Sequence, residues 1–339
     1  MRYLISLLLI CISLSSSQPH TEAATITGSP HLPITEPLYS KLVEYAHLID
    51  IAYCISGVTR IQPPFECENG CDAFNDTDVL FQWSSDDLDM WRRPWDALRP
   101  QFRIVNDRFA TTGYIAAWHP RETIVIVLRG TRSFKDTIVD LNTDMVEFGP
   151  DCPACKVHSG FLHSFRKTWL HIQQTVQQAL VMYPAYKVVV MGHSMGGAVS
   201  VLLGVELLKF KHDIDDLEVI TMGQPMVGNK IFAHYVDSLL HLRGPGAFEE
   251  GKLLRVTHKN DPIVKLPLSD SYIIGERYAH SSNEIFIDEL GHHLPDIGNV
   301  VYCEGSEDDY CSHGMKFTRD NTEHLNYFRR MGMCGIGPF

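Results

Sequence analysis

The sequence is poor in basic residues and contains no basic block. Its 339 residues include 29 lysines and arginines against 41 aspartates and glutamates, which gives a formal net charge of −12. A protein that neutralises a phosphate backbone needs the opposite sign of charge, so we expect no nucleic-acid partner. The net negative charge by itself does not indicate a substrate class, because a solvated acidic surface gives the same excess of acidic over basic residues.

Long apolar runs, internal repeats and low-complexity tracts are also lacking. Beyond the N-terminus no stretch approaches the ~20 apolar residues of a membrane-spanning helix, so no transmembrane segment is expected. Hydrophobic residues make up 45% of the chain and charged residues 21%. These are ordinary values for a globular protein with a sizeable core, and they exclude disorder as the main state.

The apolar run at the N-terminus is short. Arg2 precedes apolar residues 3–14, and three serines follow at 15–17. One positive charge, a short apolar run and small residues at its end are typical of a secretory signal peptide. We therefore expect a signal peptide over residues 1–17, with cleavage there or as late as Ala24, and a secreted, extracellular protein. A signal anchor is the alternative interpretation.

Cysteine usage agrees with secretion. Nine cysteines less Cys11 of the predicted signal leave an even number, which suits disulfides in an oxidising compartment: Cys54, Cys67, Cys71, Cys152, Cys155, Cys303, Cys311 and Cys334. A zinc site at Cys152 and Cys155 would need a second ligand pair at similar spacing, and the other cysteines are too scattered. We expect no metal, and the spacing leaves the disulfide pairing open. One N-glycosylation sequon begins at Asn75.

Continuous apolar runs rich in β-branched residues alternate with segments whose apolar residues recur every three or four positions. Strands are predicted at 123–128, 186–191, 217–221 and 253–258. Helices are predicted at 38–53, 161–180 and 195–209. Such alternation indicates βαβ units and an α/β fold with a mainly parallel sheet, in a single domain over residues 25–339. Residues 60–102 show no sustained period and are predicted to be rich in loops.

A G-x-S-x-G motif centred on Ser194 lies where the strand 186–191 meets the helix 195–209. A nucleophile elbow requires that junction, because the serine must stand on a sharp turn above the sheet. Gly192 and Gly196 leave room for a strained turn. A tight turn with an idle serine is the alternative interpretation.

A serine nucleophile needs a base, and the base needs an orienting carboxylate, in the chain order Ser, acid, His. Asp261 directly follows the strand 253–258, where sites of open α/β sheets gather. A turn aspartate before Pro262 is the alternative, and three rival acids follow no comparable strand: Asp270, Asp288 and Asp296. The candidate bases are His280, His292, His293, His313 and His324, and residue chemistry alone does not choose among them.

Three segments occur in an order typical of the secreted class 3 lipases of fungi and yeasts: residues 125–131 (VIVLRGT), 192–197 (GHSMGG) and 222–229 (MGQPMVGN). The chain resembles this family from Leu38 to Gly335, most closely its extracellular yeast members and less closely its Rhizomucor-type members. The resemblance implies a single domain of the α/β-hydrolase fold, with a mainly parallel central sheet, flanking helices and a lid helix.

The resemblance also assigns roles. The family's catalytic histidine lies in a His-Leu-x-Tyr-Phe segment, which here is His324 to Phe328, and the matching acid and nucleophile are Asp261 and Ser194. The oxyanion hole would be formed by Thr131 and the backbone N–H of Met195, although the family commonly has Leu at the latter position. The lid would include Ser133, Phe134, Ile138 and Leu141, for which a surface helix is the alternative.

The disulfide pairing that the resemblance implies is Cys54–Cys334, Cys67–Cys71, Cys152–Cys155 and Cys303–Cys311. The implied enzyme is a cofactor-free serine hydrolase of carboxylic esters, a triacylglycerol lipase that acts as a monomer on lipid at an oil–water or membrane-like interface. Feruloyl esterase or phospholipase activity on the same fold is the second hypothesis. A non-catalytic lipid-binding protein is the third.

The lid hypothesis predicts interfacial activation. Opening a helix that covers the site exposes Phe134 and Ile138, which costs about 25 cal/mol per Å² in water and is offset at a lipid surface. Rates of tributyrin hydrolysis should therefore rise as the substrate passes its solubility limit. Replacing both residues with Ser should weaken that rise more than it slows hydrolysis of a soluble ester. Smooth saturation in both proteins, with no rise at the limit, would identify the segment as an ordinary surface helix.

Overall fold

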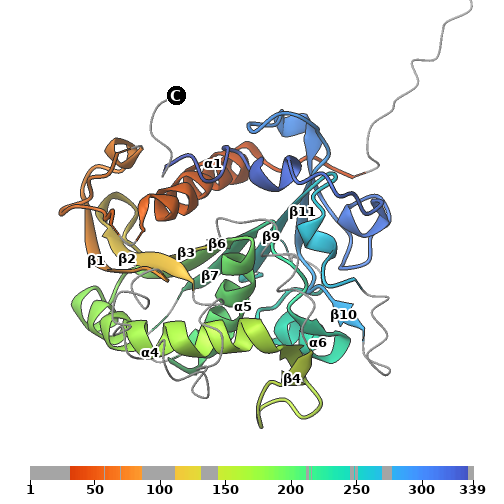
Figure 1. The fold of residues 1–339 in the computed structure, drawn as a ribbon, viewed down its shortest axis with the longest axis horizontal. Coiled ribbons are helices and arrows are strands. Elements are labelled where there is room, and N and C mark those ends of the chain that lie inside the picture. Colours follow the sequence, from red (N-terminus) through yellow and green to blue (C-terminus); the bar gives the residue numbers. More distant parts are fainter. Residues whose placement is uncertain are drawn as a thin grey trace, which may run out of the picture.

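The structure is a computed structural model, and it describes residues 31–56, 58–68, 70–85, 111–130, 144–210, 214, 216–244, 248, 251–268 and 277–334. An eight-stranded sheet runs through its centre in the order β1-β2-β3-β6-β7-β9-β11-β12 (Figure 1). These strands are β1 (Thr77–Trp83), β2 (Thr112–Trp118), β3 (Thr123–Arg129), β6 (Lys187–His193), β7 (Leu217–Met222), β9 (Leu253–His258), β11 (Glu284–Ile287) and β12 (Val300–Tyr302). The strands from β3 to β11 pair in parallel, which confirms the predicted α/β fold with a mainly parallel sheet. The remaining strands β1, β2 and β12 pair antiparallel with their neighbours.

Helices cover both faces of this sheet, with α1 on one face and α4 and α5 on the other (Figure 1). Alternate residues of β3 explain the two layers, because Ile124 and Ile126 pack in the α4–α5 core while Val125 and Val127 pack against the α1 side. Both faces of the strand are therefore buried, which is why it reads as one continuous apolar run. The helices are α1 (Glu36–Ile51), α4 (Ser159–Met182), α5 (Met195–Leu207) and α6 (Lys230–Leu239).

A smaller sheet and several short 3₁₀ helices complete the described structure. The sheet has the order β10-β8-β5-β4 and consists of β4 (Met145–Glu147), β5 (Lys156–His158), β8 (Gly228–Asn229) and β10 (Tyr278–Ala279). The 3₁₀ helices are η1 (Ala52–Cys54), η2 (Cys71–Ala73), η6 (His119–Arg121), η7 (Leu208–Phe210), η8 (Ile263–Lys265), η9 (Ile297–Asn299), η10 (Ser312–Gly314) and η11 (Glu323–Leu325). Among the described helices, none is long and apolar enough to cross a membrane.

The predicted elements correspond closely to those observed. The four predicted strands are β3, β6, β7 and β9, and the three predicted helices are α1 with η1, α4, and α5 with η7. The described part of the stretch 60–102, which is predicted to be rich in loops, also contains β1, a half-exposed edge strand that pairs with β2. Residues 86–102, the predicted signal peptide and residues 25–30 lie outside the described residues.

The described residues contain four disulfides, and they are the pairs that the family resemblance implies: Cys54–Cys334, Cys67–Cys71, Cys152–Cys155 and Cys303–Cys311. The first joins residues 280 positions apart and connects η1 to the C-terminal segment, whereas the other three close loops of 3 to 8 residues. The long loop restricts the unfolded chain far more than the short ones do.

Removing the long disulfide should therefore destabilise the protein most. A variant with both Cys54 and Cys334 replaced by Ser should lose up to about 5 kcal/mol of unfolding free energy, because the loop it opens is the longest. The matched control replaces Cys303 and Cys311 by Ser and should lose distinctly less. Denaturant titrations measure both losses. Equal losses in the two variants would contradict the loop-entropy argument, and non-reducing peptide mapping checks the pairing itself.

Candidate active site

The turn between β6 and α5 brings Ser194 above the sheet in a strained conformation. The backbone of Ser194 has φ 58° and ψ −130°, a conformation that residues other than glycine rarely adopt. A Cβ at Gly192 would lie 2.5 Å from the carbonyl oxygen of Gly196, and a Cβ at Gly196 would lie 2.4 Å from the carbonyl oxygen of Leu128. Both glycines are therefore required by close backbone approach, as the elbow interpretation predicts.

The three residues that the sequence analysis proposed as a triad come together. His324 Nε2 lies 2.9 Å from Ser194 Oγ, and His324 Nδ1 lies 2.9 and 3.0 Å from the two carboxylate oxygens of Asp261. All three residues are at least 95% buried. In the neutral histidine, Nδ1–H donates to the carboxylate and Nε2 accepts from the serine hydroxyl, which is the arrangement that a general base needs.

Asp261 remains ionised although it is buried. Burial alone raises its pKa, but the charge of His324 and hydrogen bonds from His324, Tyr327 and the N–H of Ile263 together hold the pKa below its usual value. The Tyr327 hydroxyl donates to Oδ2 over 2.5 Å, and the Ile263 N–H donates to Oδ1 over 2.8 Å. The sequence analysis included Tyr327 only as part of the 324–328 segment and gave it no role.

The rival acids lie outside this arrangement. Asp288 forms an ion pair with Lys259, with Oδ1 and Nζ 2.6 Å apart. Asp296 is exposed, and Asp270 lies outside the described residues.

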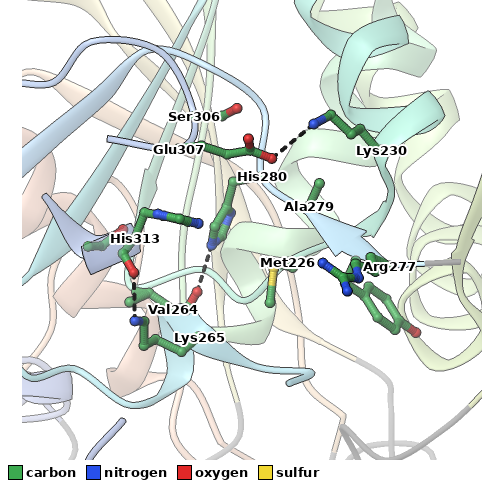
Figure 2. A pocket seen from close by; sticks show the side chains of 12 residues that line it. Met226, Lys230, Val264, Lys265, Arg277, Ala279, His280, Ser306, Glu307 and His313 are labelled. Atoms are coloured by element: carbon green, nitrogen blue, oxygen red, sulfur yellow. Dashed lines mark hydrogen bonds and ion pairs between the residues drawn. The ribbon is translucent and has the colours of Figure 1, made fainter. Parts of the chain in front are cut away.

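The rival histidines are also placed elsewhere. His280 and His313 line a pocket of about 380 Å³, and the residues around that pocket include no member of the triad (Figure 2). His280 Nε2 donates to the carbonyl oxygen of Val264 over 2.6 Å, and His313 Nδ1 lies 3.1 Å from the carboxylate of Asp309. The two remaining candidates, His292 and His293, are exposed.

Cationic side chains of the same pocket have partners of their own. Lys230 pairs with Glu307 at 3.0 Å, and Lys265 Nζ donates to the carbonyl oxygen of His313 over 2.9 Å (Figure 2). These contacts lie within the pocket and involve no member of the triad.

The backbone around Ser194 provides a place for an oxyanion. Met195 is the first residue of α5, so its N–H has no helical carbonyl to bind and lies at the positive end of the helix dipole. A Cβ at Gly130 would lie 2.9 Å from the Ser194 Cβ, which shows how closely the end of β3 approaches the nucleophile. Thr131 follows Gly130 directly. It lies outside the described residues, as do the predicted lid residues Ser133, Phe134, Ile138 and Leu141.

A parallel sheet, an elbow at the end of β6 and a Ser–His–Asp chain define an α/β-hydrolase. Residues 125–271 match the family Lipase (class 3). The chain is 31% identical over 333 residues to secreted mono- and diacylglycerol lipase 2 of Gibberella zeae, an alignment that spans 91% of this chain and 78% of that relative. The protein therefore belongs to the class 3 lipase family.

Solved structures agree with that assignment. The crystal structure of the Lip2 lipase of Yarrowia lipolytica superposes with a TM-score of 0.75 at 31% identity and covers 91% of this chain and 99% of that chain. A triacylglycerol lipase whose catalytic centre is described as a serine protease triad superposes with a TM-score of 0.69 at 27% identity, over 89% and 98% of the two chains.

The geometry predicts that Asp261 is essential for turnover. Asp261→Asn should preserve the fold but favour the wrong tautomer of His324, and the loss in kcat should be roughly 10⁴-fold, as for triads in general. The matched control is Asp288→Asn, which removes a carboxylate of the same type outside the triad and should leave kcat near normal. Initial rates on a soluble short-chain ester measure both. Near-normal turnover by Asp261→Asn would remove this residue from the triad.

Proposed function

We propose that this protein is a secreted lipase that hydrolyses the ester bonds of triacylglycerols with Ser194, His324 and Asp261 as its catalytic triad. The observation that carries the proposal is the buried hydrogen-bonded chain from Ser194 Oγ through His324 to Asp261. Relatives that align with 82% to 92% of this chain are named lipases, which supports the proposal.

The reaction follows from the positions of these atoms. Ser194 Oγ attacks the ester carbonyl while its proton passes to His324 Nε2, and Asp261 stabilises the imidazolium that forms. The imidazolium then protonates the departing diacylglycerol oxygen, which leaves an acyl-enzyme. His324 next takes a proton from water, whose oxygen attacks the acyl group. The tetrahedral intermediate collapses, the fatty acid leaves, and Ser194 regains its proton.

Two backbone features would stabilise the oxyanion of each tetrahedral intermediate. We assign one donor to the N–H of Met195 and the second to Thr131, which follows the close approach of Gly130 to Ser194. One such donor contributes about 10²- to 10³-fold to kcat. The segment from Ser133 to Leu141 follows directly along the chain, and we assign it to the lid.

Secretion and the remaining assignments have separate support. Residues 1–17 match a signal peptide in composition, the described chain contains four disulfides, and a relative is named as secreted. Asn75 is exposed beside β1, where a glycan could be attached. The triad is complete within one chain, so a monomer over residues 25–339 can act alone.

A second candidate substrate class is favoured by one specific observation. The Gibberella zeae relative is named a mono- and diacylglycerol lipase, which makes mono- and diacylglycerols the second candidate substrates of this chain. The two candidates share the mechanism and differ only in how many acyl chains the site accepts.

Ser194→Ala should abolish hydrolysis while the protein remains folded, because the hydroxyl oxygen is the attacking atom. The matched control is Ser238→Ala, which removes a serine hydroxyl that donates to the backbone carbonyl oxygen of His234 on the exposed face of α6. A panel of triolein, diolein, phosphatidylcholine and methyl ferulate measures substrate class. Triolein as the best substrate supports the proposal, and preference for diolein selects the second candidate. Preference for the ferulate or the phospholipid would overturn both, and failure of a serine-reactive phosphonate to label the wild type would indicate a non-catalytic protein.

A further inference from the structure

A second histidine lies directly before the nucleophile and is used by no step described above. His193 is the last residue of β6, and only 1% of its surface is exposed. Its Nε2 lies 2.8 Å from the backbone carbonyl oxygen of His324, and its Nδ1 lies 2.6 Å from the hydroxyl of Tyr53 in η1. The two histidine rings are 4.6 Å apart between centroids.

The partners determine which nitrogen of His193 carries the proton. A carbonyl oxygen only accepts hydrogen bonds, so Nε2 must be the donor to His324. In the neutral ring Nδ1 is then the acceptor, and the Tyr53 hydroxyl donates to it. The carbonyl of His324 therefore fixes the tautomer of His193, and the Tyr53 hydroxyl stabilises that tautomer by donating to its unprotonated Nδ1.

His193 also remains uncharged beside the triad. Burial and then the nearby charge of His324 lower the pKa of His193 to about 3, whereas the carbonyl of His324 and the carboxylate of Asp261 act weakly in the opposite direction. Tyr327, whose ring centroid lies 5.8 Å from that of His193, keeps its proton because burial raises its pKa. No second positive charge therefore forms next to the imidazolium of His324 during turnover.

Tyr53 is itself held in place. It precedes Cys54, whose disulfide partner is Cys334 in the C-terminal segment. The guanidinium of Arg129, at the end of β3, lies 5.6 Å from the centre of the Tyr53 ring and donates to the carbonyl oxygen of Gly130 over 2.8 Å. Tyr53 thus connects the end of α1 with the strand end that approaches the nucleophile.

We infer that His193 and Tyr53 are positioning residues that hold the backbone of His324 so that its imidazole reaches Ser194. The inference rests on the proposed function, because it gives His324 the role of general base. The need for such a contact is physical. His324 lies in η11, a helix of only three residues, and a misplacement of about 1 Å at a catalytic group can lower turnover about 10²-fold.

The first test compares two tyrosines that each donate one buried hydrogen bond. Tyr53→Phe removes the hydroxyl on His193, and its control Tyr114→Phe removes a hydroxyl that donates to the carbonyl of Leu48 over 2.8 Å, away from the triad. Both should lower Tm by a similar amount. Only Tyr53→Phe should lower kcat on p-nitrophenyl butyrate, by about tenfold, with KM within twofold of wild type. Equal kcat in the two variants would overturn the inference.

The second test asks whether the donor position matters. His193→Gln places an amide N–H near the original Nε2, whereas His193→Asn carries the same amide one methylene shorter and cannot reach the carbonyl of His324. Gln should keep kcat within about tenfold of wild type, and Asn should lose about 10²-fold, as expected for a displaced base. Similar losses in both variants would overturn the inference.

The third test is a double-mutant cycle that also separates this inference from the proposed function. Because Tyr53 acts through His193, adding Tyr53→Phe to His193→Asn should reduce kcat no further, whereas independent structural effects would multiply. If the losses in kcat of the two single variants multiply in the double variant, the inference is overturned, but the assignment of the triad is not affected. Failure of the proposed function would be seen separately, as undiminished hydrolysis by Ser194→Ala.

Discussion

The active site depends on keeping one carboxylate ionised in the protein interior. Asp261 is almost fully buried, and a buried charge is unfavourable unless its oxygens receive hydrogen bonds and an opposite charge lies near. His324 and Tyr327 supply two of its donors and come from the same short segment, three residues apart. The acid is therefore completed only when the segment that carries the base has docked, so that charge stabilisation and assembly of the triad are one event.

Docking of that segment is organised from the other end of the chain. Asp50, fully buried at the end of α1, accepts hydrogen bonds from Arg329 Nε at 2.7 Å and from the N–H groups of Gly332 and Met333 at 2.8 and 3.1 Å. The Cys54–Cys334 disulfide lies at the same junction and joins it covalently. The only helices or strands in the segment from 311 to 334 are two 3₁₀ turns. The hydrogen bonds to Asp50 and the disulfide therefore hold this segment in place of regular secondary structure.

The sequence predicted the parts of the site whose causes are local. The strand β6, the elbow and α5 follow from a β-branched run, two glycines and an apolar segment that are adjacent in the chain. The choice of His324 over its four rivals required the family resemblance, since nothing near any of these histidines signals a partner 130 residues away. Tyr327 and the edge strand β1 lacked a local signal too, because each acquires its role from a distant partner, Asp261 or β2.

The nucleophile and the base are therefore stabilised by different means. Ser194 holds its unfavourable backbone conformation because the sheet and α5 leave no alternative. Its N–H donates to Met222 across the β6–β7 pair, and its neighbouring glycines are in contact with backbone atoms of β3 and α5. Strain of this kind persists only where the surroundings over-determine it. The base has no such rigid support, since its segment has little regular structure and is held by side-chain hydrogen bonds, Asp50 and a disulfide. Ester hydrolysis at this site needs both kinds of support. The rigidly held Ser194 can be activated only if the imidazole of His324, which is anchored separately, lies within hydrogen-bond distance of it.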